Sequence, residues 1–157
     1  MASSLHRNAM AQMLYEYNGG GGPVSGFAQD GNKLKLYTSA SSPSKDGIEG
    51  VEFIEVASGS GYVPDGKQID FVDHVLGNAP TPPTPANKQI VIQYLGADPS
   101  WTASGGSILN IAGAYLTDAN DMVLAWWERA APLTLGDGDT LVCDDLTIRL
   151  LANNGEA

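Results

Sequence analysis

The sequence predicts a mainly β fold, an antiparallel β-sandwich or jelly roll that follows one short N-terminal helix. Two observations carry this prediction. The chain alternates apolar and polar residues in many short runs, and 19 glycines and 9 prolines supply frequent turns between them. Charged residues make up only 17% of the chain, where about a quarter is usual. At 157 residues we expect a single domain over residues 1–157, with the sandwich over 32–151.

The predicted helix covers residues 3–17. Its apolar residues recur every four positions, at Leu5, Ala9, Met13 and Tyr17. A pair of serines can cap the start, and the glycine run 19–22 can end the helix. Such a stripe either packs on the core or docks on a partner, so Leu5 and Met13 are candidate partner-binding residues.

About eight strands are expected from the period-two pattern, which places successive side chains on opposite faces of a sheet. The runs are 33–37, 51–56, 67–72, 90–94, 107–117, 122–127, 140–143 and 146–151. Residues 136–139 read Gly-Asp-Gly-Asp and suit a tight reversal. The chain is therefore expected to end in a hairpin whose last strand inserts into a sheet and closes the fold.

Two segments interrupt the strand pattern and are predicted to be flexible loops. Residues 18–32 are rich in glycine, and residues 77–87 are rich in proline. Ordering a loop costs about 1–2 kcal/mol per residue, which contacts with a neighbour would have to offset. The proline-rich segment either bridges the two sheets or binds such a neighbour. It supplies four further candidate partner-binding residues: Pro80, Pro82, Pro83 and Pro85.

The three tryptophans suggest a surface function. Trp126 and Trp127 are adjacent in a predicted strand and must face opposite ways. We expect one of them in the core and the other exposed, together with Trp101. Trp101 and Trp127 are therefore candidates for a partner interface. An exposed tryptophan is equally suited to binding a sugar ring, so a carbohydrate-binding module is an alternative function.

Catalytic and metal-binding patterns are missing from the sequence. His74 adjoins Asp73, but no second ligand cluster accompanies the pair. The aspartates of the C-terminal turns lack the spacing of a calcium loop, and no serine lies in a nucleophile-elbow motif. The single cysteine, Cys143, lies in an alternating run and is expected to be a small core residue. The sequence thus predicts a binding or structural protein, with no catalytic residues and no cofactor.

The net charge of −10 argues against two classes of partner. Nucleic acids and anionic membrane surfaces both require clustered positive charge, which this chain lacks. No apolar stretch approaches the about 20 residues that a membrane span needs. The N-terminal segment has no basic region followed by an apolar core, so we expect synthesis in a cytoplasm.

Most of the chain resembles a group of small virion proteins of tailed bacteriophages. Four segments carry the resemblance in order: "HRNAMAQMLY", "KLKLYTSAS", "GVEFIEVASGSGYVPDGKQIDF" and "SILNIAGAYLTDANDMVLAWWERAAPLTLGDGDTLVCDDLTIRL". It is clearest from Ile108 to Leu150 and rests on the order of these patterns. The two loops and the Asp65-Gly66 pair after "GYVP" depart from the group's pattern.

The resemblance implies a short helix followed by an antiparallel sandwich, and a structural function in the virion. The protein is expected to be a capsid decoration (cement) protein that binds the outer face of the shell and stabilises contacts between capsomers. An attachment to the tail or to head fibres is the alternative. The expected partners are the major capsid protein and other copies of the chain, in a trimer or dimer. The expected location is the capsid surface, after synthesis in the host cytoplasm.

Overall fold

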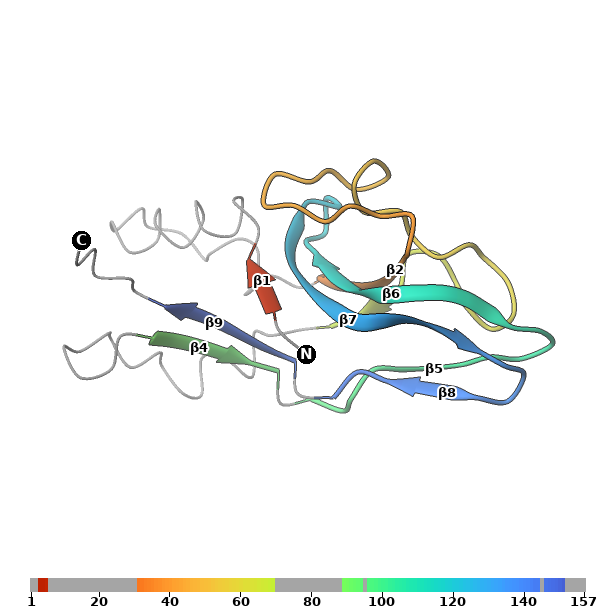
Figure 1. The fold of residues 1–157 in the computed structure, drawn as a ribbon. Helices are drawn as coiled ribbons and strands as arrows, with labels where there is room; N and C mark the ends of the chain where they lie inside the picture. The colour runs from red at the N-terminus through yellow and green to blue at the C-terminus, as the bar shows by residue number, and fades with distance from the viewer. Residues whose placement is uncertain (1–2, 6–30, 70–88, 95, 145, 152–157) are drawn as a thin grey trace.

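The computed structural model describes residues 3–5, 31–69, 89–94, 96–144 and 146–151 (Figure 1). This part of the chain is mainly β and contains no helix. Its strands are β1 (Ser3–Leu5), β2 (Lys33–Thr38), β3 (Lys67–Gln68), β4 (Gln89–Gln93), β5 (Ser100–Thr102), β6 (Ile108–Thr117), β7 (Val123–Leu135), β8 (Thr140–Val142) and β9 (Thr147–Leu151). The predicted antiparallel β class is therefore confirmed.

The largest element is an antiparallel five-stranded sheet with the strand order β1-β7-β6-β2-β3. Its centre is the long β6–β7 hairpin, in which Tyr115 pairs with Trp126. The hairpin turn is fixed by Asp118, whose Oδ1 accepts hydrogen bonds from the backbone N–H groups of Asn120 (2.8 Å) and Met122 (2.9 Å). Aspartate favours turns because its short carboxylate can bond the backbone two residues on.

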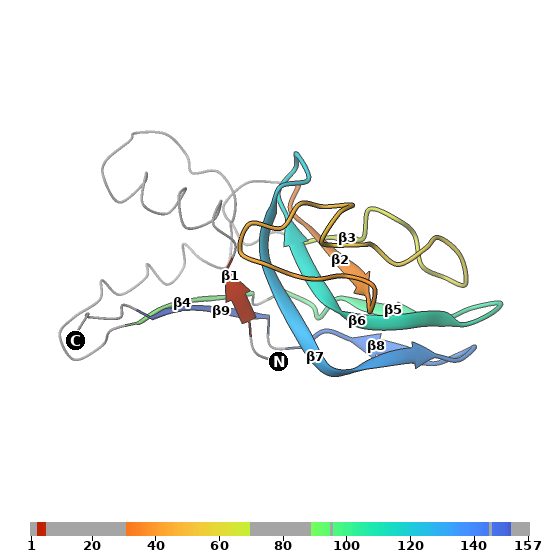
Figure 2. The ribbon, with the colours of Figure 1, turned by 45° about the horizontal axis from the view of Figure 1, so that its top comes forward.

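The remaining strands form two antiparallel pairs, β4–β9 and β5–β8. Two backbone hydrogen bonds continue the ladder between them: Tyr94 N to Leu146 O (3.0 Å) and Cys143 N to Pro99 O (2.9 Å). The two pairs therefore follow one interrupted ribbon. Figures 1 and 2 show β5 and β8 lying along β6 and β7, while β4 and β9 extend away from the sheet.

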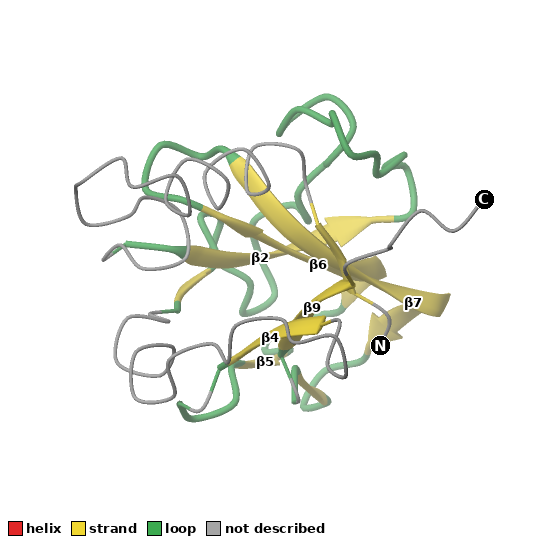
Figure 3. Cartoon of the chain, turned by 90° about the vertical axis from the view of Figure 1, so that its left-hand side faces the viewer, coloured by secondary structure: helices red, strands yellow, loops and turns green. Residues whose placement is uncertain are grey.

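The main core lies between the sheet and the β5–β8 pair, and Figure 3 shows β4 and β5 below β2 and β6. Leu34 and Trp127 face it from the sheet, and Trp101 and Leu141 face it from the ribbon. Cys143 is also in this core, where burial raises the pKa of its thiol to about 11. The prediction that Cys143 is a core residue is confirmed.

The opposite face of the sheet carries a second apolar cluster, which we call the outer cluster. It consists of Tyr37, Phe53, Tyr115, Val123 and Trp126. Phe53 comes from the loop 39–56, and its ring lies 5.3 Å from that of Tyr115 and 5.7 Å from that of Trp126. Both faces of the central strands are therefore buried, one under the ribbon and the other under a loop.

Two predictions of secondary structure are corrected. The predicted helix was to include residues 3–5, but these form β1 and pair with residues 125–127 of β7. The rest of that helix lies outside the described residues. The run 51–56 is a loop with isolated bridges, because only Phe53 and Val56 of its apolar residues point inward.

The C-terminal reversal is present at residues 136–139, where Asp139 N donates to Gly136 O (2.9 Å). The strands on either side of it, β7 and β8, do not pair with each other, so the expected hairpin does not form. β8 pairs with β5 and β9 pairs with β4, so each finds its partner far along the chain. The last strand joins the ribbon and not the large sheet. The loop predicted for residues 77–87, and nearly all of the one predicted for 18–32, lie outside the described residues.

The outer cluster yields a first testable prediction. Phe53 is fully buried, so Phe53→Ala should lower the free energy of unfolding by about 3–5 kcal/mol through lost burial and a residual cavity. The adjacent Ile54 is 37% exposed, and Ile54→Ala is the matched control, with an expected cost of about 0.5 kcal/mol. Denaturant unfolding measures both. Equal costs would show that the loop does not cover the sheet.

Candidate functional site

The most unusual side chain of the described residues is Lys35, in the middle of β2. Its neighbours Leu34 and Leu36 point into the main core, so Lys35 points to the opposite face, beside Tyr115 in the next strand. The loop 39–56 covers that face, and only 3% of the lysine side chain is exposed. An ammonium removed from water at such a position is costly unless carboxylates surround it.

Three carboxylates surround this ammonium. The Nζ atom of Lys35 lies 2.6 Å from Glu49 Oε1, 3.0 Å from Asp121 Oδ1 and 3.4 Å from Asp65 Oδ1. Lys33, two residues earlier on the same face, binds Asp65 at 2.7 Å and lies 3.8 Å from Asp121. We call these five residues the lysine cluster. Glu49 is its most buried carboxylate, with 20% of the side chain exposed.

The pKa of Lys35 shows how well the charge is compensated. Burial by itself lowers this pKa, but the hydrogen bonds to Glu49 and Asp121 outweigh the effect and raise it above its ordinary value. Lys35 is therefore an ammonium at neutral pH and has no lone pair with which to act as a nucleophile or base. The arrangement suits a structural ion cluster.

The exposed edge of the cluster is sensitive to acid. The hydrogen bond from Lys33 lowers the pKa of Asp65 below its ordinary 3.8. A carboxylate with a lowered folded-state pKa stabilises the fold above its ordinary pKa, and the contribution is lost as the pH falls through the folded-state value. Because 60% of the Asp65 side chain is exposed, this contribution is small.

Two buried tyrosines extend the polar network. The Tyr115 hydroxyl donates to Glu49 Oε1 (3.2 Å), so this oxygen receives bonds from both Tyr115 and Lys35. The Tyr62 hydroxyl donates to Glu55 Oε1 (2.7 Å) and accepts from the Leu36 backbone N–H (3.1 Å). Burial raises the pKa of both phenols, which are neutral at physiological pH.

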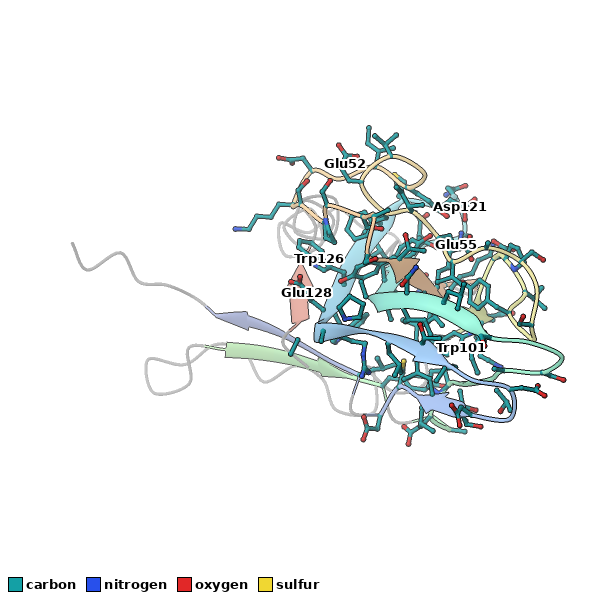
Figure 4. All side chains as sticks on the ribbon, turned by 45° about the vertical axis from the view of Figure 1, so that its right-hand side comes forward. Glu52, Glu55, Trp101, Asp121, Trp126 and Glu128 are labelled. Atoms are coloured by element: carbon teal, nitrogen blue, oxygen red, sulfur yellow. The ribbon has the colours of Figure 1, made fainter. Side chains whose placement is uncertain are left out.

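Each carboxylate of the cluster comes from a different connecting segment. Glu49 belongs to the loop 39–56, Asp65 to the loop 57–66 and Asp121 to the β6–β7 turn. Figure 4 shows Asp121 and Glu55 at the same end of the sheet, with Glu52 on the loop above. The two lysines of β2 thus fasten three segments to one strand. We call these segments the three braced loops.

The Asp65-Gly66 pair shows how the backbone reaches the cluster. Both residues have positive φ, at 79° and 64°, and a Cβ on Gly66 would collide with the carbonyl of Leu34. Glycine permits this close approach to β2. The Asp65 N–H donates a hydrogen bond to Glu55 Oε1 (2.9 Å), and the Asp65 carboxylate accepts one from Lys33.

The braced loops also present exposed aliphatic side chains. The exposed fractions are 63% for Ile48 and Val51, 70% for Val63 and 40% for Met122. Ile48 directly precedes Glu49, Val63 lies two residues before Asp65, and Met122 directly follows Asp121. The same segments that are held by charge on their inner side thus expose aliphatic side chains to the solvent.

The tryptophan candidates are corrected by their burial. Trp126 and Trp127 do point to opposite faces of the sheet, as predicted, but both are buried because the loop 39–56 covers the outer face. Trp101 is only 4% exposed and lies 6.4 Å from the Tyr62 ring, beneath the Lys67 ammonium. Neither Trp101 nor Trp127 forms an exposed platform in this structure.

The other candidate residues are not tested by the structure. Leu5 lies in β1, where its backbone is paired with Ala125. Met13 and the four prolines of the 77–87 segment (Pro80, Pro82, Pro83 and Pro85) lie outside the described residues.

Sequence reasoning missed the lysine cluster altogether. Lys33 and Lys35 alternate with Leu34 and Leu36, which is the usual pattern of a strand with one face in solvent. Tyr37 lies on the same face as the two lysines. This aromatic residue was the one signal in the sequence that the face is covered. Nothing in the sequence indicated that Glu49 and Asp121, 14 and 86 positions from Lys35, would reach it.

Within the described residues, no group of three or more His, Cys, Asp or Glu side chains is arranged to hold a metal ion. The same part of the chain has no helix that is long and apolar enough to cross a membrane. No protein-family model matches the sequence, and searches of curated proteins and of solved structures find no significant relative.

The cluster yields a second testable prediction. Lys35→Met leaves the Glu49 carboxylate without its ammonium, and should lower the free energy of unfolding by about 3 kcal/mol, as for other broken buried ion pairs. Adding Glu49→Gln removes the stranded charge while a hydrogen bond with Tyr115 stays possible, and should recover most of the loss. Denaturant unfolding at neutral pH measures both variants.

The matched control is Lys33→Met, two residues away on the same face of β2. Its partner Asp65 is largely exposed, so the expected loss is at most about 1 kcal/mol. If the two lysine variants lose the same stability, or if the second substitution brings no recovery, Lys35 does not have the structural role assigned to it.

Proposed function

We propose that this protein is a structural component of a bacteriophage virion, and most specifically a capsid decoration (cement) protein on the outer face of the shell. The resemblance to small tailed-phage virion proteins from "KLKLYTSAS" to "LTIRL" suggests this class. The antiparallel β architecture agrees with the fold that the resemblance implies. In this proposal the sheet and the ribbon are the two layers of a sandwich, and the major capsid protein is the partner.

The observation that carries the proposal is the construction of the three braced loops. A surface that is already rigid favours tight attachment to a shell, because loops that order only on binding spend interaction energy on entropy. Here the ammonium of Lys35 holds two of these segments through Glu49 and Asp121. The exposed aliphatic side chains next to those anchors are then available for contact with capsomers.

The described titratable groups support a structural function over an enzymatic one. Lys35 is held as an ammonium, Tyr62 and Tyr115 as neutral phenols, and Cys143 as a buried thiol. Each is stabilised in its unreactive form, whereas catalytic groups are tuned toward reaction. We therefore propose no catalytic activity for this site.

The two alternative functions differ in their support. Attachment to the tail or to head fibres uses the same braced loops and is distinguished by copy number. The carbohydrate-binding alternative depended on exposed tryptophans, and Trp101 and Trp127 are buried. A contact of the 18–32 or 77–87 segment with the capsid or an adjacent subunit stays a prediction from the sequence.

Copy number in the virion provides the test of location. Purified particles of the phage that encodes this chain should contain it in a fixed ratio to the major capsid protein, because decoration follows the repeating lattice of the shell. Quantitative mass spectrometry of the particles measures this ratio. A dozen copies or fewer per particle would place the protein at the tail or neck, and absence from the particle would contradict a virion function.

The braced loops can be tested separately. Ile48→Ser combined with Val51→Ser removes two exposed aliphatic side chains, and should weaken binding to particles that lack the protein by tenfold or more, at about 1.4 kcal/mol per factor of ten. The thermal midpoint should stay within a few degrees, because neither residue is in the core.

The matched control removes two exposed aliphatic side chains elsewhere. Leu109, at the far end of β6, is 56% exposed, and Val142, in β8, is 48% exposed. Leu109→Ser with Val142→Ser should leave particle binding unchanged. Unchanged binding of the Ile48/Val51 variant would instead place attachment on another surface.

A further inference from the structure

Strand β4 has a self-complementary sequence. Its five residues, Gln89 to Gln93, read Gln-Ile-Val-Ile-Gln in both directions. Two copies of this strand that run antiparallel and centre on Val91 place each residue opposite its equivalent. Val91 then faces Val91 of the partner subunit, isoleucine faces isoleucine, and glutamine faces glutamine. Such pairs of β-branched residues stabilise adjacent strands.

Within the described residues, one edge of β4 has no strand paired with it. Among the described residues β4 pairs only with β9, and β9 also lies close to β1. Figure 1 shows β4 as the outer strand of this pair, away from the large sheet. An isolated pair of strands is marginally stable in water, and an apolar strand edge without a partner is a site for pairing with another chain.

The distribution of charge along the chain favours a second copy of the same chain as the partner at this edge. Copies of a protein with a net charge of −10 repel each other over most of their surface. β4 carries no charged residue, and its partner β9 carries only Arg149, so this strand pair lacks the negative charge of the rest of the chain. Two copies therefore meet at β4 with less repulsion than elsewhere.

The register also predicts a sheet with one apolar face. Ile90 and Ile92 of β4 are paired with Leu150 and Ile148 of β9, so these four residues share a face. Val91 shares the other face with Arg149. Joining two ribbons through β4 gives the strand order β9-β4-β4-β9, which doubles the apolar face and extends each ladder to four strands.

We propose that β4 is a homodimerisation edge, where two copies of this chain pair antiparallel about a two-fold axis through Val91. An interface of this kind is isologous, since the same residues contribute from both sides. It selects a dimer over a trimer for the free protein. The proposal rests on β4 alone, so it can hold even if the protein is found outside a virion.

The test changes the one residue that would face itself. In Val91→Glu the new residue is opposite Arg149 in the register of β4 and β9, so opposite charges are paired within the chain, but across the axis it is opposite a second glutamate. Sedimentation velocity of the full chain should show wild-type dimers and a dissociation constant raised by about tenfold or more in the variant. The matched control is Thr147→Glu, with the same charge change on β9, which should dimerise as the wild type does.

A mixing experiment identifies the register. Val91→Lys combined with Arg149→Glu, which keeps opposite charges at this pair within the chain, should also dissociate, but an equimolar mixture of this variant with Val91→Glu should form heterodimers, because glutamate then faces lysine across the axis. Recovery in the mixture supports the proposed pairing. Three results overturn it: a wild-type chain that is monomeric at every concentration, a Val91→Glu variant that dimerises normally, or a mixture that stays dissociated. If a strand of another protein occupies this edge instead, the wild-type chain will be monomeric at every concentration, which is the first of these results.

Discussion

The structure depends on one buried charge, the ammonium of Lys35 in the centre of β2. Its position is imposed by the strand, since Leu34 and Leu36 must face the main core and Lys35 must then face the outer cluster. A lysine that is 3% exposed on an aromatic face is tolerated only with carboxylates around it. Glu49 and Asp121 satisfy that requirement, and in doing so they bring the loop 39–56 and the β6–β7 turn to the same strand. The loop in turn places Phe53 over the sheet and completes the burial of Trp126.

This arrangement explains how a chain with few charged residues and no disulfide holds long irregular segments in place. The single cysteine is buried in the core, so no internal crosslink is possible, and the three braced loops bury only three large apolar side chains, those of Phe53, Val56 and Tyr62. The lysine cluster and the ring of Phe53 hold the loops on the outer face of the sheet, while the β5–β8 pair covers the inner face. The braced loops then have a rigid inner side and an exposed apolar side, which is the property that the proposed attachment to a shell requires.

Local patterns predicted much of the fold, and long-range contacts account for what they missed. Alternation located β2, β4, β6, β8 and β9, and the adjacency of Trp126 and Trp127 correctly placed them on opposite faces. Alternation does not say what covers a face, so the exposure expected for Trp101 and for one of the tryptophan pair was wrong. The same limit hid the candidate site, because Lys35 has the sequence pattern of a solvent-facing residue. The partners of β8 and β9 are β5 and β4, and a reversal at residues 136–139 could not reveal a pairing that joins distant segments.

The central claim is that Lys35 braces its loops together, and amide hydrogen exchange tests it most directly. In the wild-type protein, protection should be present at backbone N–H groups whose bonds depend on the braced loops, such as Val56 with Leu36 O and Asp118 with Met122 O. In Lys35→Met the account predicts that the 39–56 loop and the β6–β7 turn lose protection together, while the β5–β8 pair keeps its own. Loss confined to one segment, or unchanged protection in both, would contradict the account.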